Sequence, residues 1–340
     1  MVVKKRFAIL ISILSIFSIL LIGCSDDKTA ENQNSSSNSN DDQKVSIGIS
    51  QIVEHPALDA AREGFIAALD SKGFKDGENL EVDYQNAQGD MPTAQTIAND
   101  FVSSKKDLIL AIATPTAQAA YNVTKDIPIA ITAVTDPVEA GLVKSWDKSN
   151  TNVFGTSDAT PADKQFKLIQ ELFPNAKNIG IIYNTSETNS EIQVEKVKKI
   201  AADLGLNIIT SGVTNVNEIS QSLDSITNDI DVLYTPTDNT VASSMPLIVD
   251  RCTEKNIPVI GAEKAHVEAG ALATEGIDYY KLGFETGLIA VKVLEGESPE
   301  DMPISTLKNT ELAINLKTAK MLDLNIPTDI KDNAILIGEE

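Results

Sequence analysis

The sequence predicts an α/β fold of two Rossmann-like lobes, each with a parallel sheet, joined by a hinge. Strand-like and helix-like segments alternate along the chain, which favours parallel sheets with helices on both faces. An apolar strand followed by Thr-Pro-Thr and a helix occurs twice, at residues 107–120 and 230–244. The tetrapeptide Val-Glu-Ala-Gly also recurs, at 138–141 and 267–270. In a chain of this length, such repeats favour two lobes of one design over a single core.

Residues 1–23 are typical of a signal peptide. Basic residues at 4–6 precede an apolar run over 7–22, which is short and interrupted by serines. The sequence Leu-Ile-Gly-Cys that ends at Cys24 resembles the bacterial lipobox, in which the cysteine is lipidated and becomes the mature amino terminus. Residues 24–44 are almost entirely polar, which predicts a disordered tether. We therefore expect an extracytoplasmic protein that is attached to the cell membrane through lipid on Cys24.

The composition argues against several classes of function. A formal charge of −21 disfavours nucleic acid as a partner. Cys24, Cys252, His55 and His266 are the only cysteines and histidines of the sequence, too few to favour a transition-metal site. The sequence contains no glycine-rich phosphate loop and no Gly-x-Ser-x-Gly nucleophile motif. We therefore expect a binding protein that needs no cofactor or metal, rather than an enzyme.

The first lobe is expected over residues 45–156 together with about 279–305. It begins with a strand at 45–50, followed by a turn and a helix with apolar residues at helical spacing. Strands at 80–85 and 108–112 come next, and the second of these runs into Thr-Pro-Thr and an alanine-rich helix. A strand at 127–131 follows. The helix at 279–294 has small residues that permit close packing, so we expect it to return to this lobe.

The second lobe is expected over residues 157–278 together with about 306–340. The chain crosses to it near 156–158, and Thr-Pro-Ala-Asp at 160–163 predicts a capping box that opens a helix. Strands at 178–182, 206–210, 232–234 and 257–260 then alternate with helices. Two of these strands repeat sequence features of the first lobe, which predicts that both lobes share one order of elements.

These features together resemble a known family, the substrate-binding lipoproteins of ABC importers, which have the type I periplasmic-binding-protein fold. Three segments narrow the resemblance to the branch that binds tryptophan and tyrosine: 52–59, 135–141 and the closing residues 314–327. The resemblance implies a monomer that captures a small aromatic amino acid between its lobes. It also implies an ABC permease and an ATPase as partners, both on other chains.

Ligands of open α/β sheets bind at the carboxyl ends of the strands, and the expected strands end in hydroxyl, amide and acidic side chains. An amino acid needs donors for its carboxylate, which Thr114, Thr116 and the following helix amino terminus offer. It needs an acid for its ammonium, for which we favour Asp238 over Glu263 and Asp136. His55, Tyr183 and Tyr234 are candidates for the side-chain slot. The candidate ligand-binding residues are Gln51, His55, Thr114, Thr116, Ala117, Thr135, Asp136, Asn184, Ser186, Tyr234, Thr237, Asp238 and Glu263.

Simpler roles stay open for several of these residues. Asp136 also fits a turn former, Asp238 a helix cap and Tyr234 a core residue. Asp158 and Glu187 are expected to be caps or solvent-facing charges. The alternatives for the whole protein are a binder of a sugar, nucleoside or branched-chain amino acid, a sensor subunit, or a surface enzyme.

Overall fold

The computed structural model describes residues 44–338. The predicted signal peptide, Cys24 and nearly all of the predicted tether lie outside this range. None of the described helices is long and apolar enough to cross a membrane.

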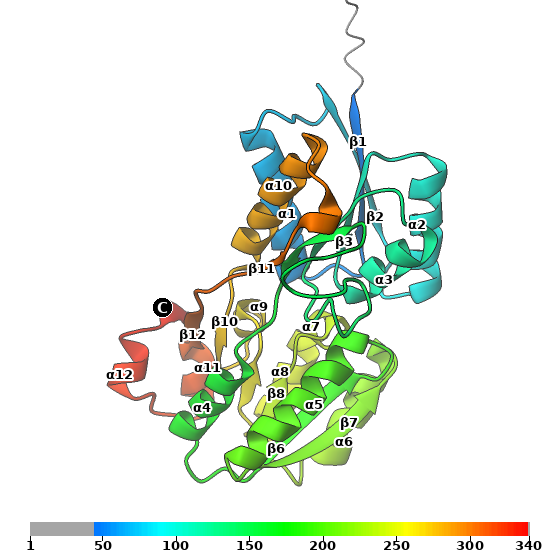
Figure 1. Ribbon diagram of the computed structural model, residues 1–340. Coiled ribbons are helices and arrows are strands. Elements are labelled where there is room, and N and C mark those ends of the chain that lie inside the picture. Colours follow the sequence, from blue (N-terminus) through cyan, green and yellow to red (C-terminus); the bar gives the residue numbers. More distant parts are fainter. Residues whose placement is uncertain (1–43, 339–340) are drawn as a thin grey trace, which may run out of the picture. The chain divides into compact units, whose positions relative to one another are not determined.

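The first sheet has six strands in the order β11-β5-β4-β3-β1-β2, and every neighbouring pair is parallel. The central strands are fully buried, because helices cover both faces of the sheet (Figure 1). The strands are β1 (Val45–Gln51), β2 (Leu80–Asn86), β3 (Leu108–Ile112), β4 (Ile129–Thr132), β5 (Val153–Ser157) and β11 (Ile304–Thr306).

Four helices flank this sheet: α1 (Pro56–Ser71), α2 (Met91–Ser103), α3 (Thr114–Val123) and α10 (Tyr279–Leu294). Helices α1 and α10 lie side by side on one face, and α2 and α3 on the other (Figure 1). Glycines allow the close approach of α1 and α10, since a Cβ atom on Gly283 would lie 1.8 Å from the Ala61 carbonyl oxygen. The helix that was expected to return to the first lobe therefore packs there.

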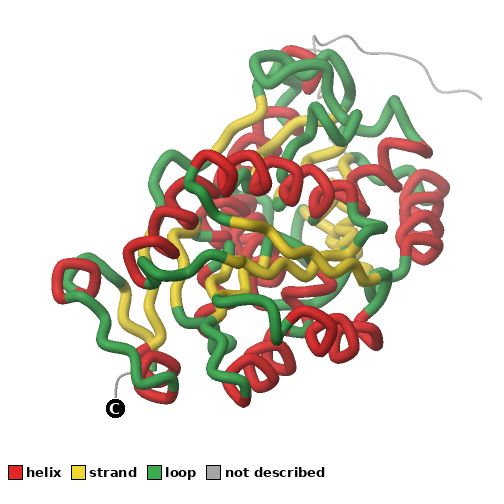
Figure 2. Tube along the Cα trace, turned by 90° about the horizontal axis from the view of Figure 1, so that it is seen from below, coloured by secondary structure: helices red, strands yellow, loops and turns green. Residues whose placement is uncertain are grey.

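The second sheet has seven strands in the order β13-β12-β10-β9-β8-β6-β7. Its strands are parallel except for the β10–β12 pair, which is antiparallel. In the view of Figure 2, helices flank the strands on both sides. The strands are β6 (Asn178–Asn184), β7 (Asn207–Val213), β8 (Val232–Thr235), β9 (Val259–Gly261), β10 (Ala273–Gly276), β12 (Glu311–Asn315) and β13 (Ile335–Ile337).

The α-helices of this part are α4 (Ala162–Leu172), α5 (Thr188–Asp203), α6 (Ile219–Ile226), α7 (Asn239–Ser243), α8 (Met245–Glu254), α9 (Lys264–Glu268), α11 (Leu316–Met321) and α12 (Thr328–Lys331). Short 3-10 turns lie at Val216–Glu218 and Pro299–Asp301. The predicted capping box at the start of α4 is wrong. The cap position is Pro161, without a side-chain bond, and Thr160 Oγ1 instead accepts a hydrogen bond from Gln193 Nε2.

The predicted α/β fold with two sheets is confirmed. The chain passes between the sheets three times: from β5 to α4, from β10 to α10, and from β11 to β12. The exact lobe boundaries and the hinge motion stay predictions.

Candidate functional site

The site lies where the carboxyl ends of the strands in the two sheets meet. Helix α3 follows β3 in the first sheet, and α5 follows β6 in the second. Gln118 Nε2 on α3 donates to Thr188 Oγ1 on α5 over 3.4 Å, so the two edges touch. His55, at the start of α1, lies beside Asn239 and His266 of the second part. Side chains from both parts therefore approach one another across the space between these strand ends.

Buried polar atoms without a hydrogen-bond partner gather around this space. Buried polar groups are nearly always paired in proteins, so an unpaired set from two facing edges indicates a polar ligand. Among the described residues, the unpaired atoms at the two edges are Ser50 Oγ, both ring nitrogens of His55, Thr114 Oγ1, Asp158 Oδ1, Asn189 Oδ1, Thr237 Oγ1, Glu263 Oε2, His266 Nε2 and Thr274 Oγ1.

Two buried carboxyl groups form the acidic end of the site. Asp158 follows β5 and Glu263 follows β9, and both side chains are 3 % exposed. Tyr279 donates its hydroxyl to Asp158 Oδ2 over 2.8 Å, which leaves Asp158 Oδ1 and Glu263 Oε2 unpaired. Burial raises the pKa of both acids, and the neighbouring Asp158 raises that of Glu263 further. No lysine or arginine of the described residues forms an ion pair with either acid. His266 Nε2 lies 3.7 Å from Glu263 Oε2, but burial lowers the pKa of this imidazole to about 3, so it brings no positive charge at pH 7. The pair is therefore suited to a cation.

The acid favoured from the sequence, Asp238, has protein donors on both of its oxygens, which makes it a weaker candidate for the ammonium than Asp158 and Glu263. Its Oδ1 accepts from the Val241 amide at 2.9 Å and caps α7. Its Oδ2 accepts from the Asn184 amide at 2.5 Å and from Ser190 Oγ at 2.7 Å. Burial and nearby Glu187 raise the pKa of Asp238 to about 7. Because both oxygens are already bonded, Asp238 shapes the turns around the site.

Glu187 was expected to be a cap or a solvent-facing charge, and the structure fits the cap and not the exposed charge. It is 6 % exposed and accepts from the amides of Asn239, at 3.3 Å, and Thr240, at 3.2 Å. Asn184 Nδ2 also donates to it. Asn184 is therefore a turn-building residue, while Ser186 is exposed and only donates its amide to Asn184 Oδ1.

Tyr234 is a core residue rather than part of the slot. It is fully buried, donates to Gln165 Oε1 over 2.6 Å and packs edge-on against Phe166. Tyr183 is half-buried and packs against the same core. Asp136 is half-buried and accepts from the Val138 and Glu139 amides, which is the turn-forming alternative.

The two threonines that start α3 differ in their partners. Thr114 Oγ1 is buried and unpaired, whereas Thr116 Oγ1 is within donating distance of the Ile112 and Ala113 carbonyls, at 2.7 and 3.0 Å. Thr116 therefore secures the start of the helix. Ala117 is fully buried in the same turn.

Gln51 and Thr135 lie on either side of α3 in the first lobe. Gln51 is fully buried, and its side chain is bonded to Val53, Asp59 and Arg62, so it holds the turn before α1. Thr135 is half-buried, and its side chain beside Asp158 lowers the pKa of that acid. Thr135 thus belongs to the acidic end.

The backbone before α3 is strained. Ala113 has φ 82° and ψ 157°, a conformation that is essentially restricted to glycine. Strain of this kind costs about 1–3 kcal/mol and is concentrated at functional sites. It directs the first amides of α3 and Thr114, and an alanine in the sequence gives no sign of it.

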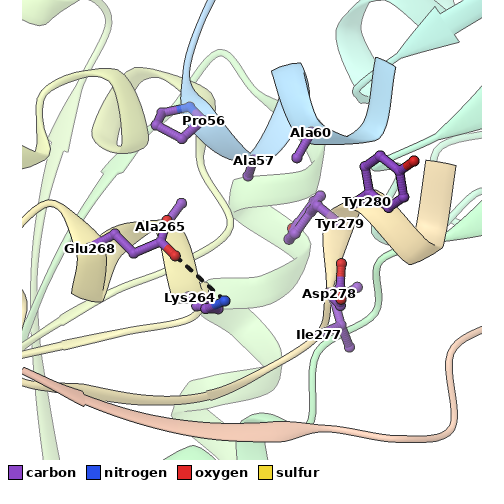
Figure 3. Close-up of a pocket in the computed structure, with 10 residues that line it drawn as sticks. All are labelled: Pro56, Ala57, Ala60, Lys264, Ala265, Glu268, Ile277, Asp278, Tyr279 and Tyr280. Atoms are coloured by element: carbon purple, nitrogen blue, oxygen red, sulfur yellow. Dashed lines mark ion pairs between the residues drawn. The ribbon is translucent and has the colours of Figure 1, made fainter. Parts of the chain in front are cut away.

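A hollow of about 360 Å³ adjoins the site (Figure 3). It lies between α1, α9 and the start of α10, and Lys264 and Glu268 form an ion pair along one side. Tyr279 lines this hollow and also bonds Asp158. The hollow thus borders the acidic end of the site.

The fold and the enclosed polar site are those of a solute-binding protein, and the comparisons agree. Residues 46–336 match the family described as ABC transporter substrate binding protein, and the chain belongs to this family. Such proteins act outside the cytoplasm and bind a solute rather than catalyse a reaction.

Individual relatives are similar over most of the chain. A tyrosine-binding protein of Clostridioides difficile is 53% identical over 90% of this chain and 88% of its own. A structure from Streptococcus pneumonia in complex with L-Trp has a TM-score of 0.84 at 38% identity, covering 86% of this chain and 99% of the other. A ligand-free, open substrate-binding protein of Clostridium difficile has a TM-score of 0.67 at 53% identity, covering 87% and 100%.

Proposed function

We propose that the protein captures an aromatic L-amino acid, tyrosine or tryptophan, and delivers it to an ABC permease driven by a separate ATPase. The observation that carries this proposal is the buried pair of Asp158 and Glu263, which has two unpaired oxygens and no ion pair with a cationic side chain. The names of the similar proteins support an amino acid with an aromatic ring.

The acid pair suits the ammonium group of the ligand. An ammonium has N–H donors for Asp158 Oδ1 and Glu263 Oε2, and Tyr279 holds Asp158 in place. A buried charge must be paired, and removing one partner of a buried pair costs about 3–5 kcal/mol. A sugar or nucleoside brings no cation to pair with the two acids.

The carboxylate of the ligand suits the start of α3. Thr114 Oγ1 is 1 % exposed and unpaired, and it lies at the amino terminus of a helix of 10 residues. The first helical amides and the positive end of the helix dipole favour an anion there. The strained Ala113 holds these donors in place.

We further propose that the lobes close on the ligand about the segments that join the two sheets. The protein is more similar in structure to the L-Trp complex than to the ligand-free open protein, although sequence identity follows the opposite order. A difference in lobe closure explains this reversal, and the Gln118–Thr188 bond spans the closed edges. We also retain a monomer anchored through lipid on Cys24.

A screen of ligand-dependent melting tests the proposal. Purified protein is heated with each of the twenty amino acids, common sugars and nucleosides, since a ligand of the folded state raises the Tm by mass action. We expect tyrosine or tryptophan to give the largest increase. An increase with a sugar or nucleoside, and none with any amino acid, would reject the proposed ligand class.

A further inference from the structure

The unpaired atoms at the two edges exceed what the charged ends of an amino acid can bind. Thr114 takes one end of the ligand and the two acids take the other. His55 Nδ1, His55 Nε2 and His266 Nε2 then still lack a partner at hydrogen-bond distance. The polar groups beside them are the Asn239 side chain, near His55, and Glu263 Oε2, which lies 3.7 Å from His266 Nε2. The three unpaired nitrogens lie in two imidazole rings from different parts of the protein, and the residues next to them, Pro56 and Ala265, line the same hollow.

His55 is placed to face a ligand. It stands at the N-cap position of α1, directly after the turn that follows β1, and its side chain makes no capping bond. The residue is 6 % exposed. Burial lowers its pKa to about 4, so the ring is neutral at pH 7 and offers one N–H donor and one acceptor nitrogen.

The ring of His266 is held in place by a hydrogen bond and by close packing. Its Nδ1 shares a hydrogen bond of 3.0 Å with Thr235 Oγ1 at the end of β8, while Nε2 stays unpaired. Burial lowers the pKa of His266 to about 3, so it too is neutral. Gly261 makes room for the ring, because a Cβ atom there would lie 2.5 Å from His266 Cβ.

We propose that His55, supported by His266, forms the polar end of the side-chain slot and hydrogen-bonds the ring hydroxyl or ring N–H of the bound aromatic amino acid. This inference rests on the proposed function and specifies its ligand class. A phenol can donate to one imidazole nitrogen and accept from another N–H, and an indole can donate. Phenylalanine offers neither, and it leaves the buried imidazoles unpaired.

The test is calorimetric titration with tyrosine and phenylalanine, which differ by one hydroxyl group. A buried polar group left unpaired costs about 1–3 kcal/mol, so the wild type should bind tyrosine about 10- to 100-fold more tightly than phenylalanine. In His55→Leu, we expect this ratio to fall below about threefold, because tyrosine loses its partner while phenylalanine does not.

Gln118→Leu is the matched control. It removes a polar contact between the two edges in the middle of α3, so it should weaken both ligands alike and preserve the ratio. A second measurement does not depend on folding of the variant: wild-type protein with ¹⁵N-labelled histidine has only two imidazoles. Their nitrogen resonances should shift more with tyrosine than with phenylalanine.

The possible failures are distinct. If the wild type binds neither tyrosine, tryptophan nor phenylalanine, the proposed function fails. If it binds tyrosine and phenylalanine equally, or if the ratio survives in His55→Leu, the role of His55 fails while the function stands. Equal histidine shifts with both ligands would also overturn the role of His55.

Discussion

The hydroxyl of Tyr279 donates to Asp158 Oδ2 over 2.8 Å, and this bond joins two of the segments that cross between the sheets. Asp158 follows β5, and Tyr279 begins α10. The same Asp158 presents its other oxygen, unpaired, beside Glu263. In the proposed complex the ligand ammonium therefore contacts the hinge segments directly, which couples binding to closure of the lobes.

Asp158→Asn and Glu263→Gln should each weaken tyrosine binding. The ammonium loses a charged partner in a buried site, at about 3–5 kcal/mol, or on the order of a hundred- to several-thousand-fold in affinity. The Tm of the unliganded variants should rise at neutral pH, because each change removes a costly buried acid. Calorimetric titration and thermal melting measure the two effects.

Asp238→Asn serves as the control for this pair. It removes an acid that is also buried but already has three hydrogen bonds to protein donors. We expect a stability loss of about 1–3 kcal/mol and a much smaller change in affinity. An affinity loss at Asp238 that exceeds those at Asp158 and Glu263 would return the ammonium site to Asp238.

The three buried acids should lower the stability of the unliganded protein as the pH rises from about 4 through about 7. Below about 6.5 the two histidines act in the opposite direction, so the fall is clearest near neutral pH. Asp158, Glu263 and Asp238 have raised pKa values in the folded state, and that of Asp238 is about 7. At these three acids the folded state therefore holds more protons than the unfolded state in this range, and their deprotonation destabilises it. Saturating tyrosine should reduce the fall, because its ammonium compensates the charges. Melting curves across the range measure both slopes, and equal slopes with and without tyrosine would count against a buried ammonium.

His55 and His266 contribute to the pH dependence of stability with the opposite sign. Burial lowers their pKa values to about 4 and about 3. Their contribution to stability is present above the unfolded pKa of about 6.5 and is lost as the pH falls below it. His55→Leu should therefore lessen acid destabilisation in a pH titration of the Tm. If the Tm of His55→Leu falls at acidic pH as steeply as that of the wild type, the His55 ring is not buried in solution.

Ala113→Gly should stabilise the protein, because glycine adopts the observed φ of 82° without strain. The relieved strain of about 1–3 kcal/mol is partly offset by the greater freedom of glycine in the unfolded chain. Ala117→Gly, four residues on within α3, has no such strain to relieve and should destabilise by about 1 kcal/mol. Denaturant unfolding measures the stability of both variants. If both lose the same free energy of unfolding, the backbone at Ala113 is not strained.

Thr114→Val and Thr116→Val should separate binding from stability. Thr114 has an unpaired hydroxyl at the site, so its loss should reduce affinity by about 10- to 100-fold with little change in Tm. Thr116 bonds the backbone at the start of α3, so its loss should cost about 1 kcal/mol of stability. If Thr116→Val instead loses affinity and Thr114→Val loses stability, the ligand carboxylate binds at Thr116.

The sequence predicted the fold because alternation, repeats and apolar strands are local signals. It also placed Thr114, Thr237 and Glu263 near the site, because each follows a strand. It missed Asp158 and Tyr279, since their pairing depends on two chain crossings that are distant in the sequence. It favoured Asp238 because a strand-end acid looks the same whether it binds a ligand or caps a helix.

The most direct test of the buried acid pair compares L-tyrosine with 3-(4-hydroxyphenyl)propionic acid, which lacks only the amino group, in calorimetric titrations of the wild-type protein. The account predicts that tyrosine binds and that the analogue binds at least about a hundredfold more weakly, because Asp158 and Glu263 are left without a cation. Equal affinity for the two compounds would contradict it.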